Sequence, residues 1–203
     1  MALINTTIMA QNFMDLAFTE SVKSEQEHYG SRHSYQRMED RKPNQTKLTF
    51  RENQFIANIH GFYMSTVGEN GWPYVQFRGG PTGFLKPLDA SRLAYADFKG
   101  NMQYISTGNL KTTKKAMLIL MDYARQSRLK IWAETEVLNA DEHPELVEKL
   151  AAPEYNAKIE RVIVFHIKGF DWNCPQHITP KYTFEEMKAL IEKYPEVLQE
   201  LQK

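Results

Sequence analysis

The fold of this chain is decided by the stretch from position 71 to position 132, which opens with Gly-Trp-Pro-Tyr-Val-Gln-Phe-Arg-Gly-Gly at residues 71–80. Short apolar segments alternate in it with polar connections that contain glycine. Asn70-Gly71 stands between two apolar runs, and this dipeptide is a strong signal for a β-hairpin. We therefore predict paired strands over residues 62–67 and 73–77.

Working outward, the same pattern predicts two more hairpins and one further strand. Their strands are expected over residues 84–88 and 92–96, 116–123 and 128–138, and 160–170. In 128–138, Leu129, Ile131, Ala133, Thr135 and Val137 alternate with Lys130, Trp132, Glu134 and Glu136, which is the pattern of a strand with two different faces. Six or seven strands at hairpin spacing favour a small antiparallel barrel over a parallel α/β fold. No G-x-G-x-x-G sequence follows a strand, so a dinucleotide-binding fold has little support.

Helices are expected mainly at the two ends of the chain, which divides it into three parts. We predict a helical N-terminal extension over residues 1–48, a barrel domain over 49–182 and a C-terminal helix over 183–203. Thr49 and Glu52 have the spacing of a capping box, as do Thr183 and Glu186, and each box predicts the start of a helix.

The composition limits the classes of partner and compartment. Among 203 residues, 25 basic and 25 acidic side chains cancel, so no overall field attracts nucleic acid or an anionic membrane. The single cysteine, Cys174, excludes an internal disulfide and fits a reducing compartment. No apolar run approaches the roughly 18 residues of a membrane span, and we expect a cytoplasmic protein. No histidine or cysteine cluster has metal-ligand spacing, so no metal is expected.

Four blocks of sequence, in this order, carry a resemblance to a known family. They are residues 71–76, 78–81 and 103–109, and Asp-Trp-Asn-Cys-Pro-Gln-His-Ile-Thr-Pro at 171–180. The chain resembles the pyridoxamine 5'-phosphate oxidase-related proteins of the FMN-binding split-barrel superfamily. The resemblance implies a mainly β fold with flanking helices, built on a six-stranded antiparallel split β-barrel. It also implies a homodimer that holds FMN in grooves between its subunits.

The chain departs from the oxidase itself at the phosphate site. An Arg-to-Lys strand segment lies along the flavin in that enzyme, and Arg78 and Lys86 occupy the similar place here, with a longer connection at 79–83. The oxidase also carries a Ser-Arg-Lys phosphate clamp, which corresponds here to Asn101-Met102-Gln103. Both clamp cations are therefore missing, which weakens an assignment as an enzyme that oxidises pyridoxamine phosphate.

A phosphate dianion binds to convergent N–H donors and to at least one cation, for which arginine offers a planar fork. Arg78 is the candidate cation, and glycines beside it allow backbone amides to approach a ligand. The connection from Gly100 to Gly108 is predicted to be a compact loop whose neutral donors bind the phosphate and ribityl hydroxyls. The alternative is a polar connector with an internally bonded turn.

Two further groups are candidates for the flavin ring. A cation on strand 128–138 beside the flavin N1–C2=O edge would stabilise the anionic reduced ring; the alternative is a solvated strand face. The loop after Trp172 would shape the substrate side, or else form part of a dimer interface. The full set of predicted cofactor-binding residues is Arg78, Gly79, Gly80, Lys86, Asn101, Gln103, Tyr104, Ser106, Asn109, Arg128, Lys130, Trp172, Gln176 and His177.

These expectations converge on an FMN-dependent oxidoreductase that acts on an unidentified small molecule by hydride transfer at flavin N5. No catalytic residue is assigned. One alternative is a flavin-binding or storage protein without turnover. Another is a barrel that has lost FMN and uses its groove for dimerisation or another ligand. The sequence does not distinguish FMN from a deazaflavin or haem.

Overall fold

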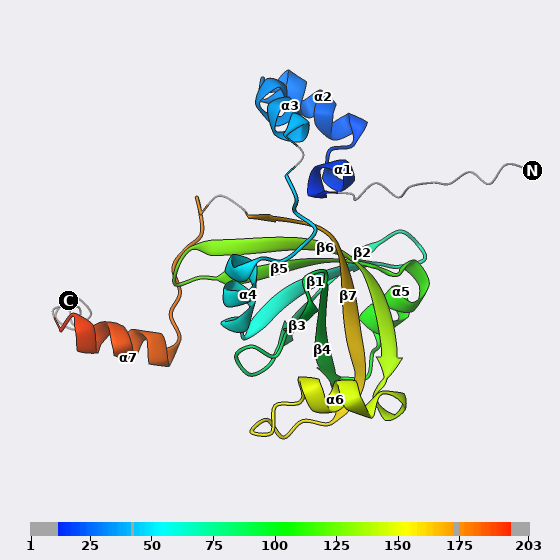
Figure 1. Cartoon of the computed structure of the whole chain (residues 1–203), viewed down its shortest axis with the longest axis vertical. Coiled ribbons are helices and arrows are strands. Elements are labelled where there is room, and N and C mark those ends of the chain that lie inside the picture. The colour runs from blue at the N-terminus through cyan, green and yellow to red at the C-terminus, as the bar shows by residue number, and fades with distance from the viewer. Residues whose placement is uncertain (1–11, 42, 173–174, 196–203) are drawn as a thin grey trace, which may run out of the picture.

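The computed structural model describes residues 12–41, 43–172 and 175–195, and its strands form one antiparallel sheet in the order β2-β1-β5-β6-β7-β4-β3 (Figure 1). The strands are β1 (Gly61–Val67), β2 (Pro73–Gly79), β3 (Lys86–Asp89), β4 (Arg92–Phe98), β5 (Lys115–Asp122), β6 (Ser127–Asn139) and β7 (Ile159–Trp172). The helices are α1 (Phe13–Ala17), α2 (Glu20–His28), α3 (Arg32–Asp40), α4 (Phe50–Ala57), α5 (Ile105–Thr113), η1 (Ala140–Glu142), α6 (Pro144–Leu150) and α7 (Phe184–Lys193).

The antiparallel split-barrel fold is confirmed, with one correction to the strand count. All seven segments predicted from hairpin spacing are strands. The count of six that the resemblance implied was wrong, because the short β3 pairs with β4 at the end of the sheet. The hairpin at Asn70-Gly71 is confirmed: Gly71 adopts a φ of +80°, and Gly68 N–H donates to the Trp72 carbonyl at 3.0 Å.

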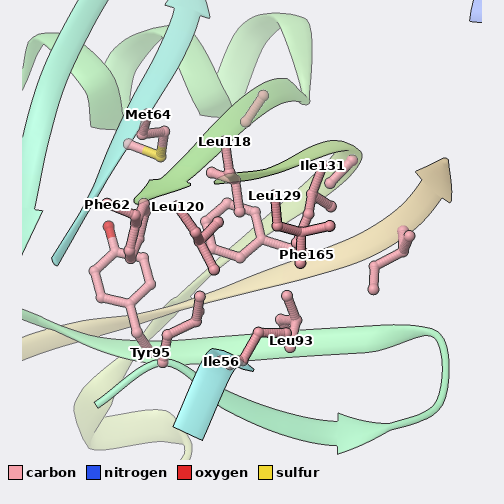
Figure 2. Close-up of a cluster of buried hydrophobic side chains, with 14 of the residues drawn as sticks. Ile56, Phe62, Met64, Leu93, Tyr95, Leu118, Leu120, Leu129, Ile131 and Phe165 are labelled. Atoms are coloured by element: carbon pink, nitrogen blue, oxygen red, sulfur yellow. The ribbon is translucent and has the colours of Figure 1, made fainter. Parts of the chain in front are cut away.

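The sheet curls on itself until strands far apart in the sheet order touch. β5, β6 and β7 separate β1 from β4 in the sheet. Even so, the ring of Phe62 on β1 lies 5.4 Å from that of Tyr95 on β4 and 6.3 Å from that of Phe165 on β7. Figure 2 shows these side chains converging on one apolar interior. The barrel is therefore closed by side-chain packing across its inside.

Strand alternation explains which side chains fill the barrel. On β6, Leu129, Ile131 and Ala133 are buried while the residues between them are partly or fully exposed, as predicted. The segment Val162 to Phe165 of β7 is buried on both faces, because its second face packs against α6 (Figure 1). Burial on both faces is typical of strands covered by helices. Here the short helix α6 covers the outer face of β7.

Glu52 ties α4 to the far end of β7. Its side chain accepts from Thr49 N–H at 2.9 Å, which confirms the predicted capping box, and from Trp172 Nε1 at 2.7 Å. Burial raises the pKa of this carboxyl, but the hydrogen bonds from Thr49 and Trp172 together lower it below its ordinary value. Arg51 also lies 4.2 Å from the centre of the Trp172 ring. The end of β7 is thus fixed against α4 within one chain.

The predicted terminal helices are present within the described residues. α1 packs on the outside of the barrel, where Phe13 stacks on Trp132 at 5.8 Å. Gly169 allows this approach, since a Cβ there would lie 2.5 Å from the Phe13 nitrogen. α7 begins at the Thr183 box, as predicted. Residues 1–11 and 196–203 of the predicted helical segments, and Cys174, lie outside the described residues. None of the helices within the described ranges is long and apolar enough to cross a membrane.

One prediction about the 100–108 connection was wrong. It is a loop only as far as Tyr104, and α5 then runs from Ile105 to Thr113. Gly108 lies on the exposed side of this helix, where glycine costs only about 1 kcal/mol relative to alanine. Leu110 is buried in the barrel core and anchors the helix. Tertiary packing therefore outweighs the loop signal of the two glycines.

The two capping boxes offer a matched test of the Glu52 link. Glu52→Ala should lower the free energy of unfolding by about 2–4 kcal/mol, because it removes a cap and leaves the half-buried Trp172 N–H without an acceptor. Glu186→Ala removes the same box from the exposed α7 and should cost less than about 1 kcal/mol. Urea unfolding followed by circular dichroism measures both, and equal losses would contradict the link.

Candidate functional site

A cavity of about 240 Å³ lies between β2, the end of β4, the start of β7 and the start of α5. We call it the β2–α5 cavity. Five of the predicted cofactor-binding residues line it together, namely Arg78, Asn101, Gln103, Tyr104 and Ser106. Two separate sequence blocks therefore meet at one place in the fold.

The N-terminus of α5 opens into this cavity without a side-chain cap. Tyr104, the residue before the helix, adopts a left-handed conformation with φ of +54°, and no side chain in the described part of the chain caps the helix. Ile105, Ser106 and Thr107, which form the first turn, all line the cavity. Free N–H groups and the helix dipole favour an anion at such a position.

A buried carboxylate stands between two arginines at the cavity wall. Asp97 Oδ1 lies 3.2 Å from Arg78 Nη1, and its Oδ2 lies 3.1 Å from Arg161 Nε. The Asp97 side chain is only 5% exposed. Burial raises the pKa of this carboxyl, and the guanidinium groups of Arg78 and Arg161 oppose the rise. Both arginines remain within reach of a ligand, because both line the cavity.

The cavity is the polar end of the barrel interior. Alternation places Asp97 on the same face of β4 as Leu93 and Tyr95, and Arg161 on the same face of β7 as Ile163 and Phe165. Neither Asp97 nor Arg161 was predicted from the sequence to belong to the site. Each could have been found from the alternation of its strand, because each is a charged residue on the face that otherwise carries buried apolar residues.

Gln76 is a third residue that the sequence analysis did not assign to the site. It lies on the inward face of β2 with Arg78, and Ser106 Oγ donates to its Oε1 at 2.9 Å. This bond joins β2 to the first turn of α5 and orients the Ser106 hydroxyl. The period-2 spacing from Arg78 could have identified it.

A second cavity of about 610 Å³ adjoins the first. The two share Tyr74, Tyr104 and Ile105 in their walls, and Trp72, whose surface is 74% exposed, lines the second. Asn109, another predicted site residue, lies here and donates from Nδ2 to Thr66 Oγ1 at 3.0 Å. The combined cleft offers an anion site at one end and aromatic side chains at the other.

Gly79, Gly80 and Lys86 lie outside both cavities. A Cβ at Gly80 would come within 2.7 Å of the Phe84 ring, so this glycine serves close packing. Lys86 Nζ donates to the carbonyl of Lys149 at 3.0 Å, at the end of α6. Their assignment to a cofactor stays a prediction.

The remaining predicted residues lie on other parts of the barrel. Lys130 pairs with Asp171 at 2.8 Å, and Arg128 Nε is buried without a hydrogen bond among the described residues. Trp172 packs against α4, as described above. Gln176 and His177 lie exposed in the turn after residue 174, and His177 has a φ of +64°. A role for these five at the flavin ring also stays a prediction.

The donors in the cleft suit binding rather than direct bond chemistry. Within residues 12–41, 43–172 and 175–195, no three acidic, histidine or cysteine side chains are grouped to hold a metal ion. Asp97 is the one carboxyl among the described residues of the β2–α5 cavity, and it is engaged by two arginines. The arrangement can hold an anionic group next to a flat one.

Comparison with known proteins gives one strong match. The family model described as pyridoxamine 5'-phosphate oxidase matches residues 48–168, which include both cavities. No curated protein matches the sequence.

Solved structures give weaker similarities. A provisionally assigned pyridoxamine 5'-phosphate oxidase from Lactobacillus delbrueckii is 24% identical over 63% of this chain and 96% of its own, with a TM-score of 0.49. An FMN-binding protein from Syntrophomonas wolfei is 17% identical over 72% and 96%, with a TM-score of 0.48. A protein related to general stress protein 26 from Clostridium acetobutylicum is 15% identical over 68% and 94%, with a TM-score of 0.46. At these values, none of the three carries a conclusion about ligand or activity.

Because burial raises the pKa of Asp97, we expect the stability of the protein to depend on pH in a definite direction. Below its ordinary pKa of 3.8, the carboxyl is protonated in both the folded and the unfolded chain. Because its pKa is raised on folding, the unfolded chain ionises first as the pH rises, and stability is lost until the folded carboxyl also ionises. Asp97→Asn cannot ionise, so its free energy of unfolding relative to the wild type should rise from pH 4 towards neutrality.

Asp89 is the control of opposite sign. The backbone N–H of Ser91 and the side chain of Arg92 lower the pKa of Asp89 to about 2, so its contribution is present above 3.8 and lost as the pH falls towards 2. Asp89→Asn should therefore lose stability relative to the wild type as the pH rises through this range. Denaturant unfolding at several pH values measures both variants. A relative stability of Asp97→Asn that falls with rising pH would show that the two arginines outweigh burial.

Proposed function

The chain belongs to the pyridoxamine 5'-phosphate oxidase family, and from this premise we propose that it binds FMN and acts as an oxidoreductase on a small molecule. One observation carries the proposal: Arg78 and the uncapped N-terminus of α5 line the same cavity. A guanidinium and free helix N–H groups are the donors that a phosphate monoester requires.

The residues present fit the parts of FMN. Arg78, Ser106 and the first N–H groups of α5 would hold the phosphate, and Gln103 would reach the ribityl chain. A cavity of about 240 Å³ is small for a cofactor of this size, whose sites usually exceed 300 Å³. The adjoining cavity of about 610 Å³, with Trp72 and Tyr74, offers space for the flat ring. FMN, when bound, supplies the redox chemistry by hydride transfer at N5.

The pairing of Asp97 with Arg78 and Arg161 favours a second candidate function. No other carboxyl lines the β2–α5 cavity within the described residues, and Asp97 is held by two arginines. The alternative is therefore a protein that binds or stores flavin without turnover. Reduction of the bound flavin by a nicotinamide nucleotide, or oxygen consumption with a substrate, distinguishes the two functions.

We further propose that two copies of the chain pair through the outer face of β1 and β2. Val75 is 59% exposed and Phe77 is 54% exposed on β2, beside Tyr63 and Val67 on β1. Exposed apolar patches of this kind mark interaction surfaces. The patch continues towards Trp72 at the open cleft, so a second copy seated there would cover the flavin ring.

Arg78→Gln tests the phosphate site. The substitution replaces the charged, bidentate guanidinium with a neutral amide, so the Kd for FMN should rise about 10- to 100-fold. Quenching of flavin fluorescence by the dialysed protein measures the Kd. Arg92→Gln is the control, because Arg92 pairs with Asp89 on the surface and lies outside the cleft. An unchanged FMN affinity in Arg78→Gln would remove this residue from the site.

Val75→Asp tests the proposed dimer. The side chain is exposed in the single chain, so a charge there should leave folding intact but prevent apolar association. Sedimentation should give the mass of two chains for the wild type and of one chain for the variant. Val22→Asp on α2 introduces the same charge away from the patch and should remain dimeric. A wild-type holoprotein with the mass of one chain would contradict the shared interface.

A further inference from the structure

We propose that Arg161, oriented by Asp97, is the second cation of the phosphate site and replaces the clamp cations that residues 101–103 lack. This inference rests on the proposed function, since the phosphate is that of FMN. Arg161 lies in β7, outside all four sequence blocks that carry the resemblance. The only local signal around it is that Arg161 shares a strand face with the buried Ile163 and Phe165.

Strand pairing places Arg161 at the cavity. Asp97 of β4 and Arg161 of β7 are register partners, and both side chains point to the inner face of the barrel. The Arg161 side chain is only 12% exposed, yet it lines the same cavity as Arg78 and the first turn of α5. A ligand held by α5 and Arg78 would therefore meet Arg161 as well.

The Arg161 guanidinium is held in one orientation by three neighbours. Its Nε lies 3.1 Å from Asp97 Oδ2, as an ion pair without hydrogen-bond geometry. Its Nη2 pairs with the Glu160 carboxylate, and its Cζ lies 5.0 Å from the centre of the Tyr104 ring. The Tyr104 hydroxyl in turn donates to Glu160 at 3.4 Å. These contacts engage two of the three guanidinium nitrogens, and Nη1 is the donor that we assign to the phosphate. A guanidinium fixed in advance loses less conformational freedom when it binds.

Arg161 is needed to offset the negative charge of the two carboxylates beside the cavity. Arg78 and Arg161 together balance Asp97 and Glu160, so the cluster is neutral with all four groups charged. Without Arg161, one cation would face two carboxylates, and the cluster would repel a phosphate dianion. The other predicted cations do not fill this place. Lys86 bonds to carbonyls near α6, Lys130 pairs with Asp171, and Arg128 lies on β6 outside this cavity.

The experiment compares FMN with riboflavin, which lacks the phosphate. In Arg161→Gln, the Kd for FMN should rise about 10- to 100-fold, while the Kd for riboflavin changes by less than about threefold. Fluorescence titration of the dialysed full chain measures both ligands. Lys168→Gln is the matched control, because Lys168 lies on the same strand, pairs with Glu134 and lies outside the cavity. Both Kd values should be unchanged in this control.

Arg161→Lys keeps the test decisive if Arg161→Gln fails to fold. It retains the charge but not the fork, so the loss for FMN should be smaller and should still spare riboflavin. Equal losses for FMN and riboflavin, or no loss for either, would overturn the role of Arg161 while the wild type still binds FMN. Failure of the wild type to bind FMN is a separate outcome, which overturns the proposed function itself.

Discussion

The contact between Phe62 and Tyr95 is the constraint on which the rest of the structure depends. These residues stand on strands separated by three others in the sheet, and their rings meet at 5.4 Å. Phe84 stacks on Phe62 at 5.6 Å and extends the same cluster. An open sheet would leave this apolar face in water, so burial of the face drives the sheet to curl. Closure then brings β2 close to β4, although the two do not pair.

That approach creates the β2–α5 cavity. Where the apolar rows of the barrel end, the same inward positions carry Arg78, Asp97 and Arg161. Burial of charge is costly unless partners are present, and here one carboxylate serves two guanidinium groups. The donors are therefore arranged by the barrel before any ligand arrives. A chain without net charge can thus gather two guanidinium groups and the free N–H groups of a helix at one place.

The Glu52 and Trp172 link has a similar role at the other end of β7. It fixes the last residue of that strand against α4 through a 2.7 Å hydrogen bond. Trp172 was predicted to lie at the flavin ring because of its sequence motif. Within one chain the indole N–H already donates to Glu52. A residue of a sequence motif can therefore stabilise the fold, whether or not it also contacts a ligand.

The sequence by itself determined the strands, because the alternation of side chains and the Asn70-Gly71 turn depend only on residues that are close in sequence. It also determined the capping boxes at Thr49 and Thr183, since each depends on residues three apart. The grouping of Arg78 with Asn101, Gln103, Tyr104 and Ser106 could be predicted only through the resemblance. The tertiary structure alone decided that α5 begins at Ile105, and that Asp97 and Arg161 join the site. Their positions follow from strand pairing across about 60 residues, and such long-range register is set by packing of the whole barrel and not by local sequence.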